Sequence, residues 1–325
     1  MKYSISRLSS SGRKIILITI TALLSLAGTA QNNAVLKLNL EKTKVYRLSS
    51  SSEQTISQTV QGMAQNVESK SHYVVSLKMM DATPEFLVTE VRFDTIDTRT
   101  NAMGKTTVIS SANEGDLTSK ETSELLSYFM NRLSKNALFV KIDYSGHVLD
   151  IVNAKMLSDM VLRDTASITL TGMMGDAVKK EIVNMVSANS LKNMLETFTW
   201  NLPGQEVSTG GTWQIMQKMN SGGMNLDINT GFKLDNIKDH MAGITSVADI
   251  KAAANATPLN SGGATVTYDD LKGMSKTTLT IDTRSGLPLE SSGKTSISGN
   301  LGVSAPGVNM QIPMTINSET RVKAL

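Results

Sequence analysis

The sequence contains no cysteine and only three histidines in 325 residues. Without cysteine the chain has no disulfide, no thiolate metal site and no cysteine nucleophile. A lipid anchor on a cysteine that follows a signal sequence is excluded for the same reason. His72, His147 and His240 lie far apart, and none has a second histidine within four residues. The spacing of a histidine metal site is therefore absent, and we expect neither a metal nor another cofactor.

Aromatic residues are also scarce, at 4% of the chain, so a stacked aromatic platform for carbohydrate is not expected. The two tryptophans, Trp200 and Trp213, are predicted to anchor the junction between helices and sheet. The sequence has no nucleophile elbow, phosphate-binding loop or dinucleotide fingerprint. A hydrolase would require His147 or an acidic pair to meet a partner in a cleft, and this is the least favoured of the functions considered.

Long apolar runs are absent except at the beginning of the chain. Ile15–Ala27 follows four basic residues and precedes Gly28-Thr29-Ala30. The run would form a helix of about 20 Å, which is too short to span a membrane. The pattern is typical of a secretory signal peptide, residues 1–30, cleaved before Gln31. We therefore expect an exported chain, periplasmic or extracellular, that is soluble and not a lipoprotein.

The net charge of the whole chain is +3, but this depends on the predicted signal peptide. Four of the 32 basic residues and none of the 29 acidic residues fall within residues 1–30. The remainder is close to neutral and has no basic stripe. A nucleic-acid partner is therefore not expected. No later apolar run reaches 18 residues, so no membrane-spanning helix is expected after cleavage.

The sequence then shows three parts with different periodicity. Residues 31–117 alternate apolar and polar side chains, as in Leu36-Lys37-Leu38-Asn39-Leu40, which is typical of strands. The turn at Asp81–Pro84 separates two long strands. The polar segment 49–65 fits either a solvent-facing hairpin or a mobile loop.

Residues 118–200 have helical periodicity, interrupted by one hairpin. Helices are predicted around residues 126–133, 156–161, 178–186 and 191–198, and a hairpin around Tyr144-Ser145-Gly146. Thr118-Ser119-Lys120-Glu121 has the pattern of a capping box at the start of the first helix.

Strand alternation returns over residues 201–325, with glycine pairs marking the turns. We therefore predict one α+β domain over residues 31–325, mainly antiparallel β. Its two β halves form a curved sheet, a half-barrel or a sandwich, with the helical insert between them. Each half contains an Asp-turn-Gly hairpin, at Asp143–Gly146 and Asp282–Gly286, which leaves an internal duplication open.

Short stretches of the sequence resemble an exported family of Bacteroidota proteins known as a domain of unknown function. The stretches are Leu36–Lys42 with Val45-Tyr46, Leu202-Pro203, Val207–Gly210 with Trp213, and Asp282–Pro288. Thr43 and Gly211 depart from the pattern of that family. The resemblance implies no catalytic residues. The expected plan of helices on a concave sheet is similar, at the level of architecture alone, to periplasmic lipoprotein carriers.

Methionine shows the one unusual bias in composition, with 19 in the chain. It is flexible and polarizable, and it suits surfaces that adapt to variable apolar shapes. Two interpretations stay open: a soft core beneath the helices, or an adaptable ligand cavity. For the second, the candidate binding residues are Phe129, Met130, Met156, Met160, Met185, Met194 and Phe198.

These observations favour a non-enzymatic binding protein that holds an apolar or lipid-like ligand between sheet and helices. Its partner would be an apolar small molecule or a lipidated protein. This hypothesis predicts an apolar cavity of at least ~300 Å³. The alternative is a structural or protein-interaction component of the cell envelope, which predicts a filled interior and an exposed apolar patch.

Overall fold

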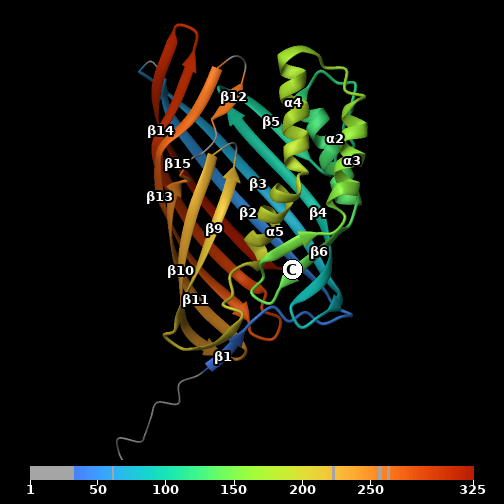
Figure 1. Cartoon of the computed structure of the whole chain (residues 1–325), viewed down its shortest axis with the longest axis vertical. Helices are drawn as coiled ribbons and strands as arrows, with labels where there is room; N and C mark the ends of the chain where they lie inside the picture. The colour runs from blue at the N-terminus through green and yellow to red at the C-terminus, as the bar shows by residue number, and fades with distance from the viewer. Residues whose placement is uncertain (1–32, 61, 222–223, 255–257, 262–263) are drawn as a thin grey trace, which may run out of the picture.

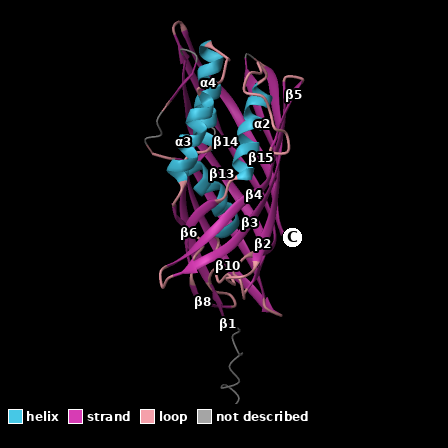
Figure 2. Ribbon diagram, turned by 90° about the vertical axis from the view of Figure 1, so that its right-hand side faces the viewer, coloured by secondary structure: helices cyan, strands magenta, loops and turns pink. Residues whose placement is uncertain are grey.

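The computed structural model describes residues 33–60, 62–221, 224–254, 258–261 and 264–325. The predicted signal peptide, residues 1–30, lies outside the described residues. A large antiparallel sheet of thirteen strands curves around four helices and does not close on itself (Figures 1 and 2). The predicted fold class, mainly antiparallel β with a helical insert between two β halves, is confirmed.

The first half and the insert run in chain order from β1 to α5. Their bounds are β1 (Asn33–Leu36), β2 (Val45–Val60), β3 (Met63–Ala82), β4 (Phe86–Ala102), β5 (Lys105–Ser110), α2 (Thr122–Lys135), β6 (Leu138–Asp143), β7 (Val148–Ile151), α3 (Ala154–Thr165), α4 (Gly172–Met185) and α5 (Ala188–Thr199).

The second half contains only strands. Their bounds are β8 (Gln205–Ser208), β9 (Thr212–Ser221), β10 (Met224–Lys238), β11 (Met241–Ala252), β12 (Leu259–Ser261), β13 (Ala264–Asp282), β14 (Pro288–Ala305) and β15 (Val308–Ala324).

The order of strands across the sheet explains how two separate stretches of sequence make one surface. The order is β7-β6-β4-β3-β2-β15-β14-β13-β11-β10-β9, with β5 beside β4 and β12 beside β13. The antiparallel pair β2–β15 joins the first half to the second, with Ser52 opposite Thr320 and Ile56 opposite Ile316. The polar segment 49–65, for which hairpin and loop stayed open, is a hairpin of β2 and β3.

The helices lie on the concave side of the sheet, toward the strands of the first half (Figure 2). Helix α2 packs against β4 and β5, and α5 packs against β7. The buried face of α2 contains Leu126, Phe129, Met130 and Leu133, the stripe with helical spacing that the sequence predicted. The main core therefore fills the space between the insert and the first half, and it continues onto the second half through residues such as Phe232, Ile244 and Leu279.

The predicted capping box at Thr118 and Glu121 is wrong. Helix α2 begins at Thr122, and the side chain of its N-cap residue, Glu121, makes no capping hydrogen bond. The hydroxyl and the amide of Thr118 both donate to the Asp116 carboxylate, at 2.7 and 2.8 Å. Because the hydroxyl of Thr118 is engaged in this local turn with Asp116, it does not cap the first free amides of helix α2.

The segment Leu36–Leu40, which we name the N-terminal strap, closes the lower end of the sheet. Its leucines are buried, with Leu38 at 0% exposure. The amide of Leu38 donates to the carbonyl of Tyr144, and the amide of Asn39 donates to that of Ser285, both at 2.8 Å. The strap therefore ties together the two Asp-turn-Gly hairpins, one from each half of the sequence.

Gly286 permits this close approach of the strap. Its φ is +76°, and a Cβ there would lie 2.3 Å from the carbonyl oxygen of Lys37. A side chain at this position would therefore force the strap away from the second turn.

The strap yields a prediction for stability. Replacement of Leu38 by alanine should lower the free energy of unfolding by about 2–5 kcal/mol, because a fully buried side chain leaves a cavity. Urea denaturation followed by circular dichroism measures the change. Val35→Ala is the matched control, since Val35 lies in β1 and is 48% exposed. Equal losses in the two variants would contradict the role of the strap.

Candidate functional site

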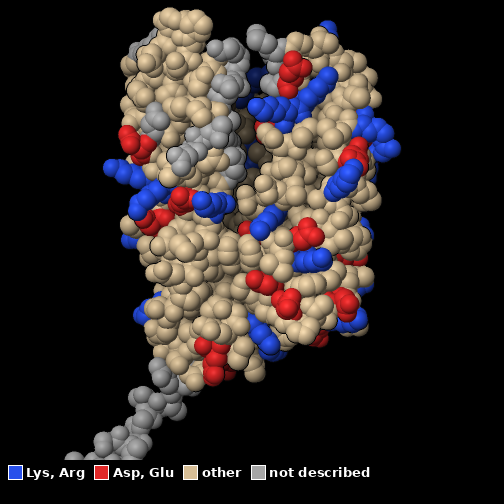
Figure 3. All heavy atoms as spheres, in the orientation of Figure 1, with Lys and Arg blue, Asp and Glu red and all other residues tan. Residues whose placement is uncertain are grey.

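A cavity of about 390 Å³ lies between helix α5 and the concave face of the second β half. Figure 3 shows the molecule hollowed between its two upper lobes, where the second β half faces the helices. One wall comes from α5 and the turn after it, through Asn193, Glu196, Thr197, Trp200 and Asn201. The other wall comes from inward-facing residues of β9, β10, β11, β13, β14 and β15.

The register of the sheet arranges the inward-facing side chains in rows that cross the strands. Toward the strap lies a row with four buried aliphatic side chains, Leu234, Ile244, Leu279 and Val322, and with two serines, Ser291 and Ser50. Two residues farther along each strand, about 7 Å, the chemistry changes to hydroxyl groups.

Two hydroxyl rows follow, which we name the lower and upper hydroxyl rows. The lower row contains Ser246, Thr277, Thr320, Ser52, Ser71 and Thr98, with Gly293 between two of them. The upper row contains Thr230, Ser275, Thr295, Ser318, Ser69 and Thr100, interrupted by Ala248 and Gln54.

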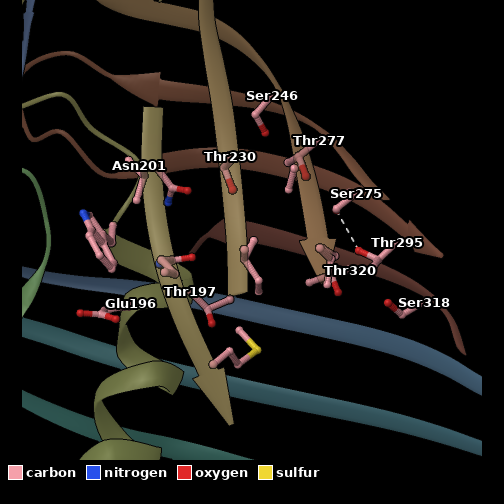
Figure 4. Close-up of a pocket in the computed structure, with 18 of the residues that line it drawn as sticks. Glu196, Thr197, Asn201, Thr230, Ser246, Ser275, Thr277, Thr295, Ser318 and Thr320 are labelled. Carbon is pink, nitrogen blue, oxygen red and sulfur yellow. Dashed lines mark hydrogen bonds between the residues drawn. The ribbon is translucent and has the colours of Figure 1, made fainter. Parts of the chain in front are cut away.

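Several of these hydroxyls converge on the cavity (Figure 4). Thr295 donates to Ser275 at 2.8 Å, and Ser52 and Thr320 lie 3.0 Å apart.

Above the hydroxyl rows lies an isoleucine row, which contains Ile228, Ile250, Ile297, Ile316 and Ile56, with Gly273 in the middle. Four of these isoleucines, together with Leu226 and Met224, also line the cavity. They belong to a second hydrophobic cluster, separate from the main core. The cavity therefore has a polar middle and an aliphatic upper part.

On the helical wall of the cavity, the buried Glu196 contacts the half-buried His147 of the β6–β7 hairpin. Oε1 of Glu196 lies 2.7 Å from Nδ1 of His147 and accepts a hydrogen bond from the amide of Val148 at 3.0 Å. Nζ of Lys192 is 3.8 Å from the same oxygen. The imidazole of His147 lies against Trp200, with ring centroids 4.1 Å apart. Despite this short separation, Nδ1 of His147 makes no hydrogen bond to the carboxylate.

Burial raises the pKa of the Glu196 carboxyl above its ordinary value of 4.5, although Val148, His147 and Lys192 act in the opposite direction. In Figure 4 the carboxylate of Glu196 points away from the strand hydroxyls. Its contacts hold the β6–β7 hairpin against α5.

Gly146 allows the β6–β7 hairpin to lie close to the end of helix α5. A Cβ at Gly146 would lie 1.9 Å from the carbonyl oxygen of Thr199, and Thr199 donates its hydroxyl to the carbonyl of Gly146 at 2.6 Å.

The methionines and phenylalanines predicted to bind a ligand lie elsewhere. Phe129, Met130 and Phe198 are buried in the main core. Three others, Met160, Met185 and Met194, are half-buried against that core, and Met156 is 57% exposed. None of the seven is among the residues that line the cavity. A role of these residues in ligand binding stays a prediction.

The residues that do line the cavity carry a weaker sequence signal. Serine and threonine alternate with other residues along β13, β14 and β15, and such strands are common. Of the two tryptophans, Trp213 is buried, stacks on Phe232 and donates from Nε1 to the carbonyl of Asn201 at 3.3 Å. Trp200 is only half-buried and faces the cavity. Glu196 was not predicted, because its partner His147 lies 49 residues away in sequence.

A second, wider hollow of about 910 Å³ lies on the convex face of the sheet. It is bordered by outward-facing side chains such as Val247, Met274 and Lys276, which are exposed. This hollow is a surface depression, whereas the concave cavity has walls on both sides.

Residues 86–288, more than half of the chain, match the family of unknown function DUF6263. The chain belongs to this family. The match includes β4, the entire helical insert and the strands that end at the second Asp-turn-Gly hairpin. It assigns no activity to the cavity residues. No curated protein matches the chain.

Two solved structures show a weak likeness. An outer membrane channel from Pseudomonas putida F1 has 6% sequence identity and a TM-score of 0.24, covering 92% of this chain and 98% of the channel. OccAB2 from Acinetobacter baumannii has 7% sequence identity and a TM-score of 0.17, and the match covers 87% of this chain and 98% of OccAB2. TM-scores this low do not establish a shared fold. Within the part of the chain that the structure describes, no helix has the length and apolarity to cross a membrane.

The raised pKa of Glu196 predicts a pH-dependent stability. A carboxyl with a raised pKa in the folded state contributes stability that is present below its ordinary value of 4.5 and lost as the pH rises through the folded value. Glu196→Gln removes the ionisable carboxyl, and with it this loss of stability at higher pH. The glutamine side chain still offers an oxygen that accepts the hydrogen bond from the amide of Val148. Relative to the wild type, the variant should therefore gain stability as the pH rises above 4.5.

Urea denaturation as a function of pH measures the difference. Glu206→Gln, an exposed position on β8, gives the background from removing a surface charge. A difference between Glu196→Gln and the wild type that does not change with pH would contradict the raised pKa.

Proposed function

We propose that this protein is an exported, non-enzymatic binding protein that holds an apolar or lipid-like ligand in the concave cavity. The occupant is a small molecule or the lipid of a lipidated partner. The observation that carries the proposal is the isoleucine row, which presents a continuous aliphatic wall to the cavity. Burial of apolar surface is the main source of affinity for such ligands.

The size and place of the cavity support the proposal. Its volume of about 390 Å³ falls in the range of small-molecule sites. The helices pack chiefly on β4, β5 and β7, and the part of the second half's concave face that carries the hydroxyl and isoleucine rows borders the cavity. The alternative, a structural component of the envelope, predicts a filled interior, and the cavity favours binding over it.

The titratable groups of the wall support a binding role over a hydrolytic one. Glu196 is engaged by His147, Val148 and Lys192, and its carboxylate points away from the cavity hydroxyls. General acid–base catalysis needs a group within hydrogen-bond reach of the reacting atoms.

A cavity-filling variant tests the proposal. Thr230 lies on the cavity wall, whereas its neighbour Asn229 is exposed on the opposite face of β10. Binding of the uncharged fluorescent probe N-phenyl-1-naphthylamine is measured by titration of the exported protein. Thr230→Phe should weaken binding by about tenfold or more, equivalent to about 1.4 kcal/mol, because the phenyl ring occupies the cavity.

Asn229→Phe is the control, since it adds the same ring on the outer face and should leave the affinity unchanged. Circular dichroism establishes that both variants are folded. If the wild type does not bind the probe, or if both variants bind it equally, the proposal is wrong.

A further inference from the structure

The hydroxyl rows are unexpected on the inner face of a curved sheet. Inward-facing positions of a sheet that packs on its own helices are normally apolar, and an inward-facing polar group needs a hydrogen-bond partner. Here the row below the hydroxyl rows is mainly aliphatic, with Ser291 and Ser50 as its polar members, and an isoleucine row lies above them. Packing alone therefore does not explain the change from aliphatic to hydroxyl and back within about 20 Å.

Some of these hydroxyls are free to bind a ligand. Within the described residues, no hydrogen bond joins the side chain of Thr230, Ser246 or Thr277 to another residue, although all three line the cavity. None of the three oxygens is sealed from the cavity, since the fully buried polar atoms without a partner are in other residues. Figure 4 shows these side chains on adjacent strands of the same wall.

The cavity also provides almost no charge. Among its described lining residues, only two carry a charged side chain: the acidic Glu196 and the basic Lys218. Lys218 is 89% exposed and lies 3.9 Å from Asp227, and Glu196 faces His147 and Lys192. An anionic or cationic head group at the hydroxyl rows would lose its hydration without gaining a counter-charge, which is costly.

We infer that the ligand is a small uncharged amphiphile, with an aliphatic chain along the isoleucine row and a hydroxyl- or ester-bearing head at the hydroxyl rows. This inference rests on the proposed function and specifies the chemical class of its ligand. Threonine and serine hydroxyls both donate and accept, so they match hydroxyl and ester oxygens equally well. The aliphatic chain takes the same place that the uncharged probe would occupy.

The inference is tested by comparing head groups on one chain length. Displacement of N-phenyl-1-naphthylamine is measured with 1-monododecanoylglycerol, dodecanoate and dodecyltrimethylammonium, each below its micelle concentration and at a pH where the carboxylate is ionised. The monoacylglycerol should bind at least about tenfold more tightly than either ion, because charged heads are desolvated without a partner.

The double variant Thr230→Val/Thr277→Val keeps the side-chain shapes and removes two hydroxyls. It should weaken binding of the monoacylglycerol by at least about fivefold and leave the ions nearly unchanged. Thr278→Val is the control, because Thr278 is exposed on the opposite face of β13. Valine suits strands, so these variants should fold.

The outcomes separate the inference from the proposed function. If all three amphiphiles displace the probe equally, or if an ion binds most tightly, the cavity binds apolar chains but the inference of an uncharged head is wrong. If none displaces the probe and the probe itself does not bind, the proposed function fails. A double variant that retains the preference of the wild type would also overturn the inference.

Discussion

The pairing of β2 with β15 is the contact on which the rest of the molecule depends. It joins the first half of the sheet to the second through strands from opposite ends of the sequence. Its register places Ser52 beside Thr320 and Ile56 beside Ile316, so each row continues across the junction. Because side chains alternate between faces, a slip of one residue would turn one half's hydroxyls and isoleucines to the convex face.

The lower end of the molecule shows how this wide sheet is held in a curve without closing. The N-terminal strap lies between two turns that are far apart in sequence. The amides of Leu38 and Asn39 each donate a hydrogen bond to one of these turns. The helical insert fills only the part of the concave side near β4, β5 and β7. The curve and the incomplete filling together leave the cavity, which is therefore a consequence of where the insert packs.

The sequence predicted the kind of elements well because their signals are local. Period-two alternation identified the strands, and the stripe at Leu126, Phe129 and Leu133 identified α2. The rows on the concave face could not be predicted, because they depend on register across many strands. Ser246 and Thr320 share a row, yet nothing in the sequence relates residues 74 positions apart.

The methionine bias illustrates the same limit. It marks the insert as rich in flexible side chains, but composition does not say which surface those side chains meet. Met130 packs in the main core, and Met160 packs against it. The contact of Glu196 with His147 likewise needs the hairpin to fold onto α5, which in turn depends on Gly146.

The hydroxyl rows have a physical cost that the fold itself does not require. Valine has the shape of threonine and a high preference for strands, and on an inward face it would bury additional apolar surface. A sheet built only for stability would therefore continue the aliphatic rows through the middle of the cavity. The polar middle makes the cavity less favourable for a pure hydrocarbon and more favourable for a molecule that carries its own hydrogen-bonding group. The same two rows that lower the affinity for a pure hydrocarbon thus provide a means of selecting among amphiphiles. The scarcity of charge among the described lining residues determines the direction of that selection.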